Sequence, residues 1–287
     1  MKNLLVTGGR GFIGSHLLNR LSKEEYNIIN FSRSQIKESG NSKIKYIQGD
    51  ITDYDCVDKA IENLEGIINL SALSRVSEAI KNPQECVDIN VKGAMNILEC
   101  AKNKKKLPWI ILGGTNESKE NIYGFSKYMS ELGAEIYSKN YGMKILSLRF
   151  ATTYGPRDKP DKLIPKLITR SIENQDLTIN NSKKEFDFIY IDDIINGIYL
   201  GIKHIESIQE RYYDSIPLCT GKTTNLEKLA KVIIKETKSA SNIIIKEEKE
   251  EVFSLIDSKK AKKILGFEAK VSIEEGIKKT IENFNSY

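Results

Sequence analysis

The sequence predicts an α/β protein with a doubly wound parallel sheet, followed by a smaller, mixed α/β C-terminal domain. Three observations carry this prediction. Over the first half of the 287 residues, short apolar runs alternate with longer amphipathic ones. A glycine-rich turn, "TGGRGFIGS" at 7–15, joins the first apolar run to the first amphipathic one. After Phe150 the alternation stops at "TTYGPRDKPDK", which is rich in turn-forming residues.

The first domain is expected over residues 1–151. Its apolar runs predict strands at 3–7, 27–32, 43–48, 66–72, 109–114 and 143–150. Its amphipathic runs predict helices at 12–23, 82–103 and 122–140. Pro83 suits the first turn of the long second helix, where a missing N–H costs nothing. Right-handed crossovers between these strands place helices on both faces of the sheet.

The second domain is expected over residues 152–287 and has shorter elements. Two capping boxes predict helix starts, at Thr224 with Glu227 and at Ser272 with Glu275. The second of these helices is expected to run from about 273 to 284. A segment near 186–203 is expected to return and pack on the first domain.

Composition excludes several classes of protein. Hydrophobic residues make up 40 % and charged residues 29 %, as in globular proteins, and the net charge is only +5. No aromatic residues alternate with a basic stripe, so nucleic acid is not an expected partner. No apolar run approaches the roughly 20 residues of a membrane span, so no membrane association is expected. The histidines His16 and His204 lack metal-ligand spacing, and no metal is expected.

The four cysteines and the start of the chain indicate a reducing compartment. No two cysteines form a C-x-x-C pair, and no signal-peptide pattern precedes the first apolar run. A cytoplasmic location is therefore expected.

The glycine-rich turn predicts a dinucleotide phosphate site. Glycine allows a tight turn and close backbone approach, and the following helix directs free N–H groups at the phosphates. The position of the turn, after a strand and before a helix, is the context that this motif requires. The expected cofactor-binding residues of the turn are Gly8, Arg10, Gly11, Phe12, Ile13 and Gly14.

The end of the second strand favours NADP over NAD. NAD-binding proteins usually carry a carboxylate there for the ribose hydroxyls, whereas this chain has Ser32 and Arg33 in "NFSRSQ". An arginine pairs bidentately with a 2′-phosphate, and Arg10 could approach the same group. NAD stays open, because both arginines could simply be solvated. At the end of the third strand, Asp50 could accept from the adenine amino group, with Ile51 beside it.

A tyrosine and a lysine follow the fifth strand at catalytic spacing. Tyr123 and Lys127 in "IYGFSKYMSE" are four residues apart, so on a helix they share a face. A free tyrosine has a pKa of about 10 and is a poor acid–base group at neutral pH. A neighbouring ammonium stabilises the phenolate and brings that pKa closer to the working range.

Motifs along nearly the whole chain carry a family resemblance. They are "TGGRGFIG", "GDITD", "INLSALSRV", "NPQECVDINVKGAMNILECA", "YGFSK", "LRFATTYGP", "FDFIYIDDI" and "DSKKAKKILGF". With these motifs the chain resembles the extended short-chain dehydrogenases/reductases, of the NAD-dependent epimerase/dehydratase type that acts on nucleotide sugars. The resemblance implies a Rossmann domain over 1–151, a substrate-binding domain over 152–287, and a homodimer formed through the tyrosine helix and the long helix before it.

The resemblance also implies residue roles. Tyr123 matches the acid–base residue and Lys127 its partner, which also binds cofactor. Thr115 matches the hydroxyl residue that bonds the substrate oxygen, with Ser118 as the alternative. Further cofactor contacts are implied at Ser71, Ala72, Leu73 and Asn90. Substrate contacts are implied at Ser74, Thr152 and Phe186.

Departures from the family pattern fall on substrate positions. Only Asn116 to Ile122 separate Thr115 from Tyr123, a shorter loop than relatives have. Thr152 stands where an asparagine is frequent, and Phe186 where an arginine is frequent. We therefore expect retained hydride chemistry with altered substrate recognition.

The expected function is an NADP-dependent reductase of a 4-keto (deoxy)sugar nucleotide. Dehydratases of the family carry an acidic pair beside the hydroxyl residue, and "GGTNES" has none. A nucleotide-sugar epimerase that uses NAD or NADP is the first alternative. A non-catalytic NADP-binding sensor or scaffold of the same fold is the second.

Overall fold

A computed structural model describes residues 1–34, 41–116, 119–247 and 255–284. The chain divides into two compact units. One comprises Met1–Phe150 and Gly197–Pro217, and the other comprises Ala151–Asn196 and Leu218–Tyr287. The segment that rejoins the first unit thus begins at Gly197, later than the expected start near 186, and ends at Pro217 rather than near 203.

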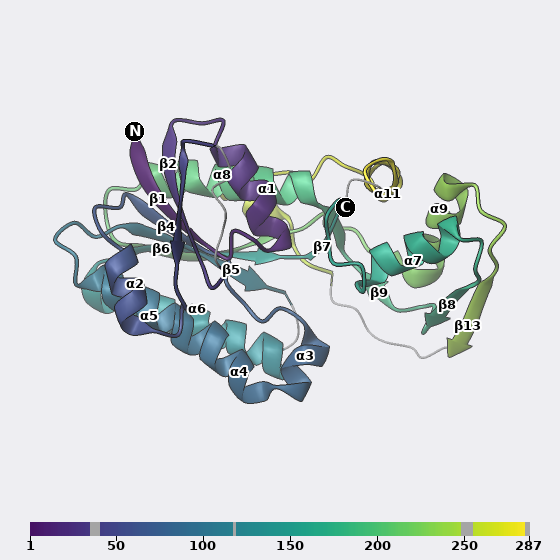
Figure 1. Cartoon of the computed structure of the whole chain (residues 1–287), viewed down its shortest axis with the longest axis horizontal. Helices are drawn as coiled ribbons and strands as arrows, with labels where there is room; N and C mark the ends of the chain where they lie inside the picture. The colour runs from purple at the N-terminus through teal and green to yellow at the C-terminus, as the bar shows by residue number, and fades with distance from the viewer. Residues whose placement is uncertain (35–40, 117–118, 248–254, 285–287) are drawn as a thin grey trace. The chain divides into compact units, whose positions relative to one another are not determined.

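The first unit is built on a seven-stranded sheet with the order β11-β6-β5-β4-β1-β2-β3 (Figure 1). All pairings from β3 across to β6 are parallel. The strand order reverses between β1 and β4, the point at which doubly wound sheets bind ligands. The strands are β1 (Lys2–Thr7), β2 (Tyr26–Ser32), β3 (Ile44–Gln48), β4 (Gly66–Asn69), β5 (Trp109–Thr115), β6 (Lys144–Phe150) and β11 (Tyr212–Leu218).

Helices cover both faces of this sheet, which confirms the predicted doubly wound α/β class (Figure 1). The face of α2, α5 and α6 buries an apolar core in which Ile67, Ile110 and Ile145 of adjacent strands meet Ile97 and Leu98 of α5. The opposite face carries α1 and the part of α8 that belongs to this unit. The helices are α1 (Phe12–Leu21), α2 (Tyr54–Ala60), α3 (Val76–Lys81), α4 (Pro83–Val87), α5 (Gly93–Lys102), α6 (Ile122–Tyr141) and α8 (Ile191–Ser207).

The prediction of a single helix over 82–103 was wrong in one respect. A π-helical turn, η1 (Asp88–Lys92), separates α4 from α5. Pro83 begins α4 at its first position, as predicted. The wider turn holds Asn90, which is 2 % exposed, inside the unit. Its side chain and carbonyl take part in the hydrogen bonds described below, and π turns are frequent at such functional positions.

The second unit is a mixture of short strand pairs and helices. β7 (Thr152–Tyr154) pairs in parallel with β10 (Phe188–Tyr190), and β8 (Leu177–Asn180) pairs in parallel with β13 (Ile243–Glu247). β9 (Glu185–Phe186) pairs antiparallel with β12 (Thr224–Asn225). Its helices, besides the start of α8, are α7 (Leu163–Ile172), α9 (Leu226–Thr237), α10 (Lys259–Leu265) and α11 (Ile273–Glu282).

One predicted helix cap of this unit is confirmed and the other was wrong. The Ser272 hydroxyl accepts from the N–H of Glu275 at 3.1 Å and starts α11. At α9 the cap is Asn225, whose side chain accepts from the N–H of Lys228 at 2.8 Å. Thr224 instead pairs with Phe186 in the β9–β12 ladder, which places it one residue too early to cap.

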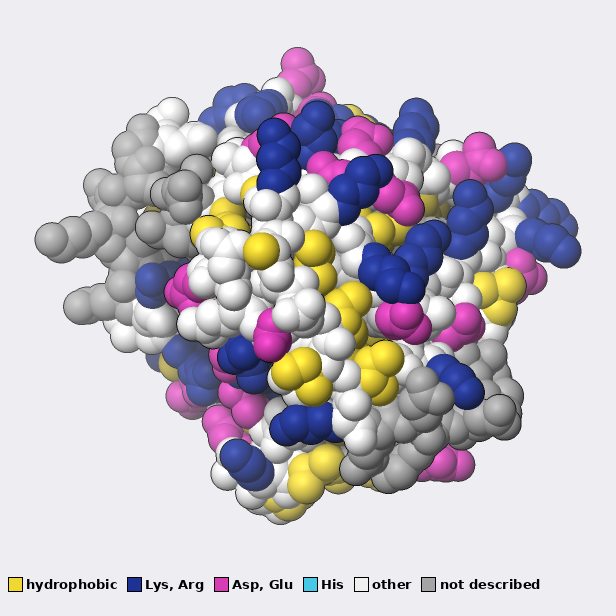
Figure 2. All heavy atoms as spheres, turned by 90° about the vertical axis from the view of Figure 1, so that its right-hand side faces the viewer, with side chains coloured by type: hydrophobic (Ala, Val, Ile, Leu, Met, Phe, Trp, Pro, Cys, Tyr) yellow, Lys and Arg dark blue, Asp and Glu magenta, His cyan; other side chains and the backbone are white. Residues whose placement is uncertain are grey.

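Positive and negative side chains are mixed on one face of the molecule. On the face drawn in Figure 2, Lys and Arg side chains lie among Asp and Glu side chains. Such a distribution suits the small net charge of +5. Across the residues that the structure describes, no helix has both the length and the apolarity to cross a bilayer.

Asp187 fastens the loop that follows β11 to the strands of the second unit. Its carboxylate is 1 % exposed and accepts from the N–H and hydroxyl of Thr220, at 2.9 and 2.8 Å, and from the N–H of Gly221 at 2.8 Å. Its own carbonyl accepts from the N–H of Thr152 at 2.9 Å. A buried acceptor with three donors cannot be removed without leaving polar groups unpaired.

We therefore expect Asp187→Ala to lower the free energy of unfolding by about 2–3 kcal/mol, because three partly buried donors lose their buried acceptor. Thermal unfolding followed by circular dichroism measures the change. Asp192→Ala is the matched control: this exposed carboxylate lies in the first turn of α8, and its loss costs about 0.3–1 kcal/mol. Equal destabilisation by both variants contradicts the assignment.

Candidate active site

The turn between β1 and α1 contains positions, Gly8 and Gly14, that a side chain would not fit. Gly8 has φ of +68°, and a Cβ there would lie 2.7 Å from the backbone of Leu70 and Ser71. A Cβ on Gly14 would overlap the carbonyl of Gly8. Gly11 donates its N–H to that same carbonyl at 2.9 Å and closes the turn. The backbone here is therefore tight, as the turn of a dinucleotide-binding loop requires.

At the N-terminus of α1, no acidic side chain of the first turn competes with a bound phosphate for the free N–H groups. Gly11 is its N-cap, and among the described residues no side chain caps it and no acidic residue lies in its first turn. The N–H groups of a first helical turn lack acceptors within the helix and carry partial positive charge. Phe12 and Ile13, which begin the helix, thus present the donors that a pyrophosphate needs. This turn fits a dinucleotide.

The end of β2 carries the residues predicted to choose the cofactor. Arg33 and Arg10 are both exposed. The hydroxyl of Ser32 is buried and has no hydrogen-bond partner among the described residues. At the end of β3, Asp50 accepts from the N–H and hydroxyl of Thr52, at 2.8 and 2.9 Å, a local role that the sequence did not predict.

The loop after β4, with Ser71, Ala72 and Leu73, is fixed from two sides. On one side, the N–H of Ser71 donates to the side-chain oxygens of Thr7 and Asn69, each at 3.2 Å. On the other, the Asn90 amide accepts from the N–H of Leu73 at 2.9 Å and donates to its carbonyl at 3.1 Å. The predicted wall of the cofactor cleft is therefore rigidly attached to the sheet and to η1.

Asn90 also joins this loop to the tyrosine helix. Its Nδ2 donates to the Ser126 hydroxyl at 2.8 Å, and its carbonyl accepts from the Ser130 hydroxyl at 2.7 Å. Ser126 in turn donates to the carbonyl of Tyr123 at 2.7 Å. The structure thus gives Asn90 a bridging role, which sequence reasoning did not anticipate.

The first turns of α6 carry the predicted acid–base pair. Asn121 caps the helix by accepting from the N–H of Gly124 at 2.9 Å, which puts Tyr123 in the first turn, half-buried. Lys127, one turn later, is 8 % exposed. Burial lowers the pKa of Lys127 to about 8, and the charges of Glu131 and Cys86 oppose that shift. The ammonium is therefore close to losing its proton near neutral pH.

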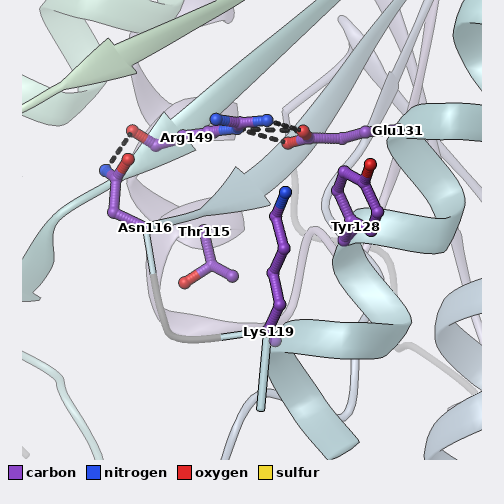
Figure 3. Close-up of a pocket in the computed structure, with 7 residues that line it drawn as sticks. Thr115, Asn116, Lys119, Tyr128, Glu131 and Arg149 are labelled. Atoms are coloured by element: carbon purple, nitrogen blue, oxygen red, sulfur yellow. Dashed lines mark hydrogen bonds and ion pairs between the residues drawn. The ribbon is translucent and has the colours of Figure 1, made fainter. Parts of the chain in front are cut away.

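An ion pair between a buried carboxylate and a half-buried guanidinium, which sequence reasoning missed, lies one turn beyond Lys127. The Arg149 guanidinium donates to Glu131 through Nη2 and through Nε, at 2.9 Å from Nε to Oε2 (Figure 3). The Ser147 hydroxyl donates to Oε1 of Glu131 at 2.7 Å. The signal was the spacing Tyr-x-x-x-Lys-x-x-x-Glu, which puts Glu131 on the face of Lys127.

A cavity of about 160 Å³ opens at the carboxyl ends of β5 and β6 (Figure 3). Thr115, the last residue of β5, lines it, and the Lys119 ammonium lies 3.5 Å from the centre of the Tyr128 ring. The alternative hydroxyl residue, Ser118, lies outside the described residues. The lining residues are Thr115, Asn116, Lys119, Gly124, Tyr128, Glu131 and Arg149.

The predicted substrate residues lie in both units. Ser74 is exposed and follows the cleft loop of the first unit. Thr152 is exposed in β7 of the second unit. Phe186 is half-buried in β9, with its ring centre 5.4 Å from that of Phe188. No group of three or more metal-binding side chains occurs within the described part of the chain.

Comparison with known proteins agrees with this geometry. The model of the NAD dependent epimerase/dehydratase family matches residues 4–214. The putative UDP-glucose 4-epimerase of Methanocaldococcus jannaschii is 29 % identical over 97 % of this chain and 97 % of that protein. The CDP-abequose synthase of Salmonella muenchen is 29 % identical over 98 % of this chain and 97 % of that protein.

A solved structure is similar over the full length of both chains. The UDP-glucuronic acid 4-epimerase from Bacillus cereus, in complex with UDP-glucuronic acid and NAD, aligns with a TM-score of 0.88 at 25 % identity, over 99 % of each chain. The family match covers well over half of this sequence. The chain therefore belongs to the NAD-dependent epimerase/dehydratase family and is an enzyme of the extended short-chain dehydrogenase type, as its motifs predicted.

Proposed function

We propose that this chain is an NADP-dependent reductase of a 4-keto (deoxy)sugar nucleotide, with Tyr123 as the proton donor. The observation that carries the proposal is a tyrosine one turn before a buried lysine, on a helix bonded to the loop beside the glycine turn. The relatives support the class of substrate: by name they act on UDP- or CDP-linked sugars. The chain is accordingly a nucleotide-sugar-modifying enzyme.

The proposed chemistry divides between cofactor and protein. Bound nicotinamide supplies hydride chemistry. Tyr123 donates a hydrogen bond and then a proton to the carbonyl oxygen of the sugar. The buried ammonium of Lys127 stabilises the phenolate that results. Thr115 donates a second hydrogen bond to the same oxygen and stabilises its developing charge.

The residues at the end of β2 favour net reduction over epimerisation. Ser32 and Arg33 replace the carboxylate that would repel a 2′-phosphate, and cells hold NADP mainly reduced. A relative named as a synthase of a CDP-sugar supports this choice. A nucleotide-sugar 4-epimerase is the second candidate, because the neighbour with bound NAD and the M. jannaschii relative carry that activity in their names.

A homodimer through α6 is part of the proposal. Four large apolar side chains on this helix are 37–47 % exposed: Phe125, Tyr128, Leu132 and Ile136. Their spacing of three or four residues puts them in one stripe. A second copy of the same stripe would cover it, as a two-fold interface is self-complementary.

We expect Tyr123→Phe to lower kcat at least about 100-fold, because the proton donor is lost while packing is kept. Loss of NADPH absorbance with a 4-keto sugar nucleotide measures it. Tyr141→Phe, at the exposed end of the same helix, is the control and keeps full activity. Unchanged turnover in the Tyr123 variant removes the catalytic assignment.

We expect Arg33→Ala to raise the Kd for NADPH about tenfold and to change the Kd for NADH less than about twofold, because one charge-assisted contact to the 2′-phosphate is lost. Nucleotide fluorescence titration gives both constants. Arg20→Ala is the control, since Arg20 on α1 pairs with Glu24 on the surface. Equal weakening of both nucleotides, or tighter NADH binding by the parent chain, would favour the NAD-dependent epimerase.

We expect Leu132→Glu to convert the dimer to a monomer, because two carboxylates would face each other across the two-fold axis. Sedimentation velocity measures the mass. Ile245→Glu, which changes an exposed apolar residue of β13, leaves the dimer intact. A parent chain that sediments as a monomer, or a variant that stays dimeric, contradicts the proposed interface.

A further inference from the structure

The ammonium of Lys127 sits where charge is costly. It is 8 % exposed, and removal from water favours its neutral form. A neutral lysine cannot stabilise a phenolate on Tyr123, so the proposed acid–base pair needs a compensating negative charge. The groups that act on Lys127 are Glu131 from its own helix and Cys86 from α4.

Glu131 is held so that its carboxylate cannot turn away. It lies one turn after Lys127 and is 4 % exposed. Arg149 of β6 and Ser147 of the same strand bind its oxygens, and the Tyr213 hydroxyl of β11 donates to its carbonyl at 3.0 Å. A Cβ on Gly114 of β5 would overlap Oε1, so β5 closes the remaining side.

The two charges of this ion pair are not equally placed. The side chain of Glu131 is 5 % exposed, whereas that of Arg149 is 35 % exposed. Water screens the guanidinium more than the carboxylate, since a charge in contact with solvent meets a higher effective dielectric. The pair therefore leaves a residual negative potential at the buried carboxylate, which belongs to the residue one helical turn after Lys127.

We propose that Glu131 is a positioning residue that keeps the Lys127 ammonium charged, and that Arg149 holds Glu131 in place while moderating its field. The role assigned to Lys127 rests on the proposed function, but the electrostatic coupling of Glu131 to Lys127 does not. Tyr123 lies on the same helix. The other titratable or charged groups that act on this cluster from the surrounding elements are Cys86, Tyr128, Glu135, Arg149, Tyr213 and Asp214.

The coupling predicts in which direction the pKa of Lys127 moves in each variant, and a purely structural role predicts no such direction. Loss of the Glu131 charge removes the effect that raises the pKa of Lys127, so that pKa falls below about 8 and the ammonium is lost at lower pH. Loss of the Arg149 charge leaves the carboxylate uncompensated, so the pKa of Lys127 rises. Both changes break the same ion pair, yet they move Lys127 in opposite directions.

The test compares Glu131→Gln, Arg149→Met and Ser147→Ala in the full chain. The alkaline limb of the kcat profile is expected to move down by about half a pH unit or more in Glu131→Gln and up in Arg149→Met. Ser147→Ala removes a hydrogen bond to Glu131 without changing charge, and its limb stays within about 0.2 of the parent value. In the double variant Glu131→Gln with Arg149→Met, the alkaline limb is expected to lie between those of the single variants. This variant replaces Arg149→Met in the comparison if Arg149→Met folds poorly.

A second readout needs no substrate. In chain labelled with ¹³Cε lysine, the resonance that disappears in Lys127→Met is titrated by NMR in each variant. Shifts of its midpoint in opposite directions support the coupling even if no 4-keto sugar is reduced, a result that would remove only the proposed reaction. Movement of both single variants in the same direction, or no movement in Glu131→Gln, overturns the coupling whether or not the enzyme turns over.

Discussion

The hydrogen bonds of buried Asn90 connect the parts on which the site depends. One side chain binds both backbone groups of Leu73, and the same residue is bonded to Ser126 and Ser130 of α6. A helix that carries an acid–base pair and a loop that lines a cofactor cleft must keep a fixed separation. Because unpaired amide atoms in a protein interior are costly, this connection is satisfied only in one arrangement. The π turn is the local distortion that brings the Asn90 amide to that position.

The parts of the fold that follow from local pattern could be predicted, and those that follow from tertiary contact could not. Apolar runs such as "WIIL" predicted where the strands lie along the chain, because strands buried on both faces are continuous in apolar residues. The glycine turn marked the passage from the first strand to the first helix. The π turn at 88–92 has no comparable signal in the local sequence, because it accompanies hydrogen bonds with α6, which is distant in sequence. The cap at Asn225 was misassigned because strand pairing of Thr224 overrode a local capping pattern.

The same division applies to the site. Gly8 and Gly14 could be named in advance, because the tight backbone at these positions requires glycine, and glycine is visible in the sequence. The tyrosine and lysine could be named from their spacing together with their position after the fifth strand of an alternating pattern. Arg149 could not, because its partner lies on a different element and a lone arginine at the end of a strand indicates nothing specific. Only packing of α6 against β6 turns Arg149 and Glu131 into one group.

An ion pair with a buried carboxylate needs a reason to exist beyond stability. Taking the Glu131 carboxylate out of water costs several kcal/mol, and well-packed apolar residues in place of such an ion pair are frequently as stable. An apolar pair at this place would leave Lys127 with no carboxylate one turn away, and burial alone would then favour its neutral amine. The arrangement becomes intelligible when the carboxylate is considered together with the ammonium one helical turn before it. Glu131 raises the pKa of Lys127, and the partly hydrated Arg149 guanidinium holds Glu131 in place while it reduces that effect. The ion pair is then part of the acid–base apparatus.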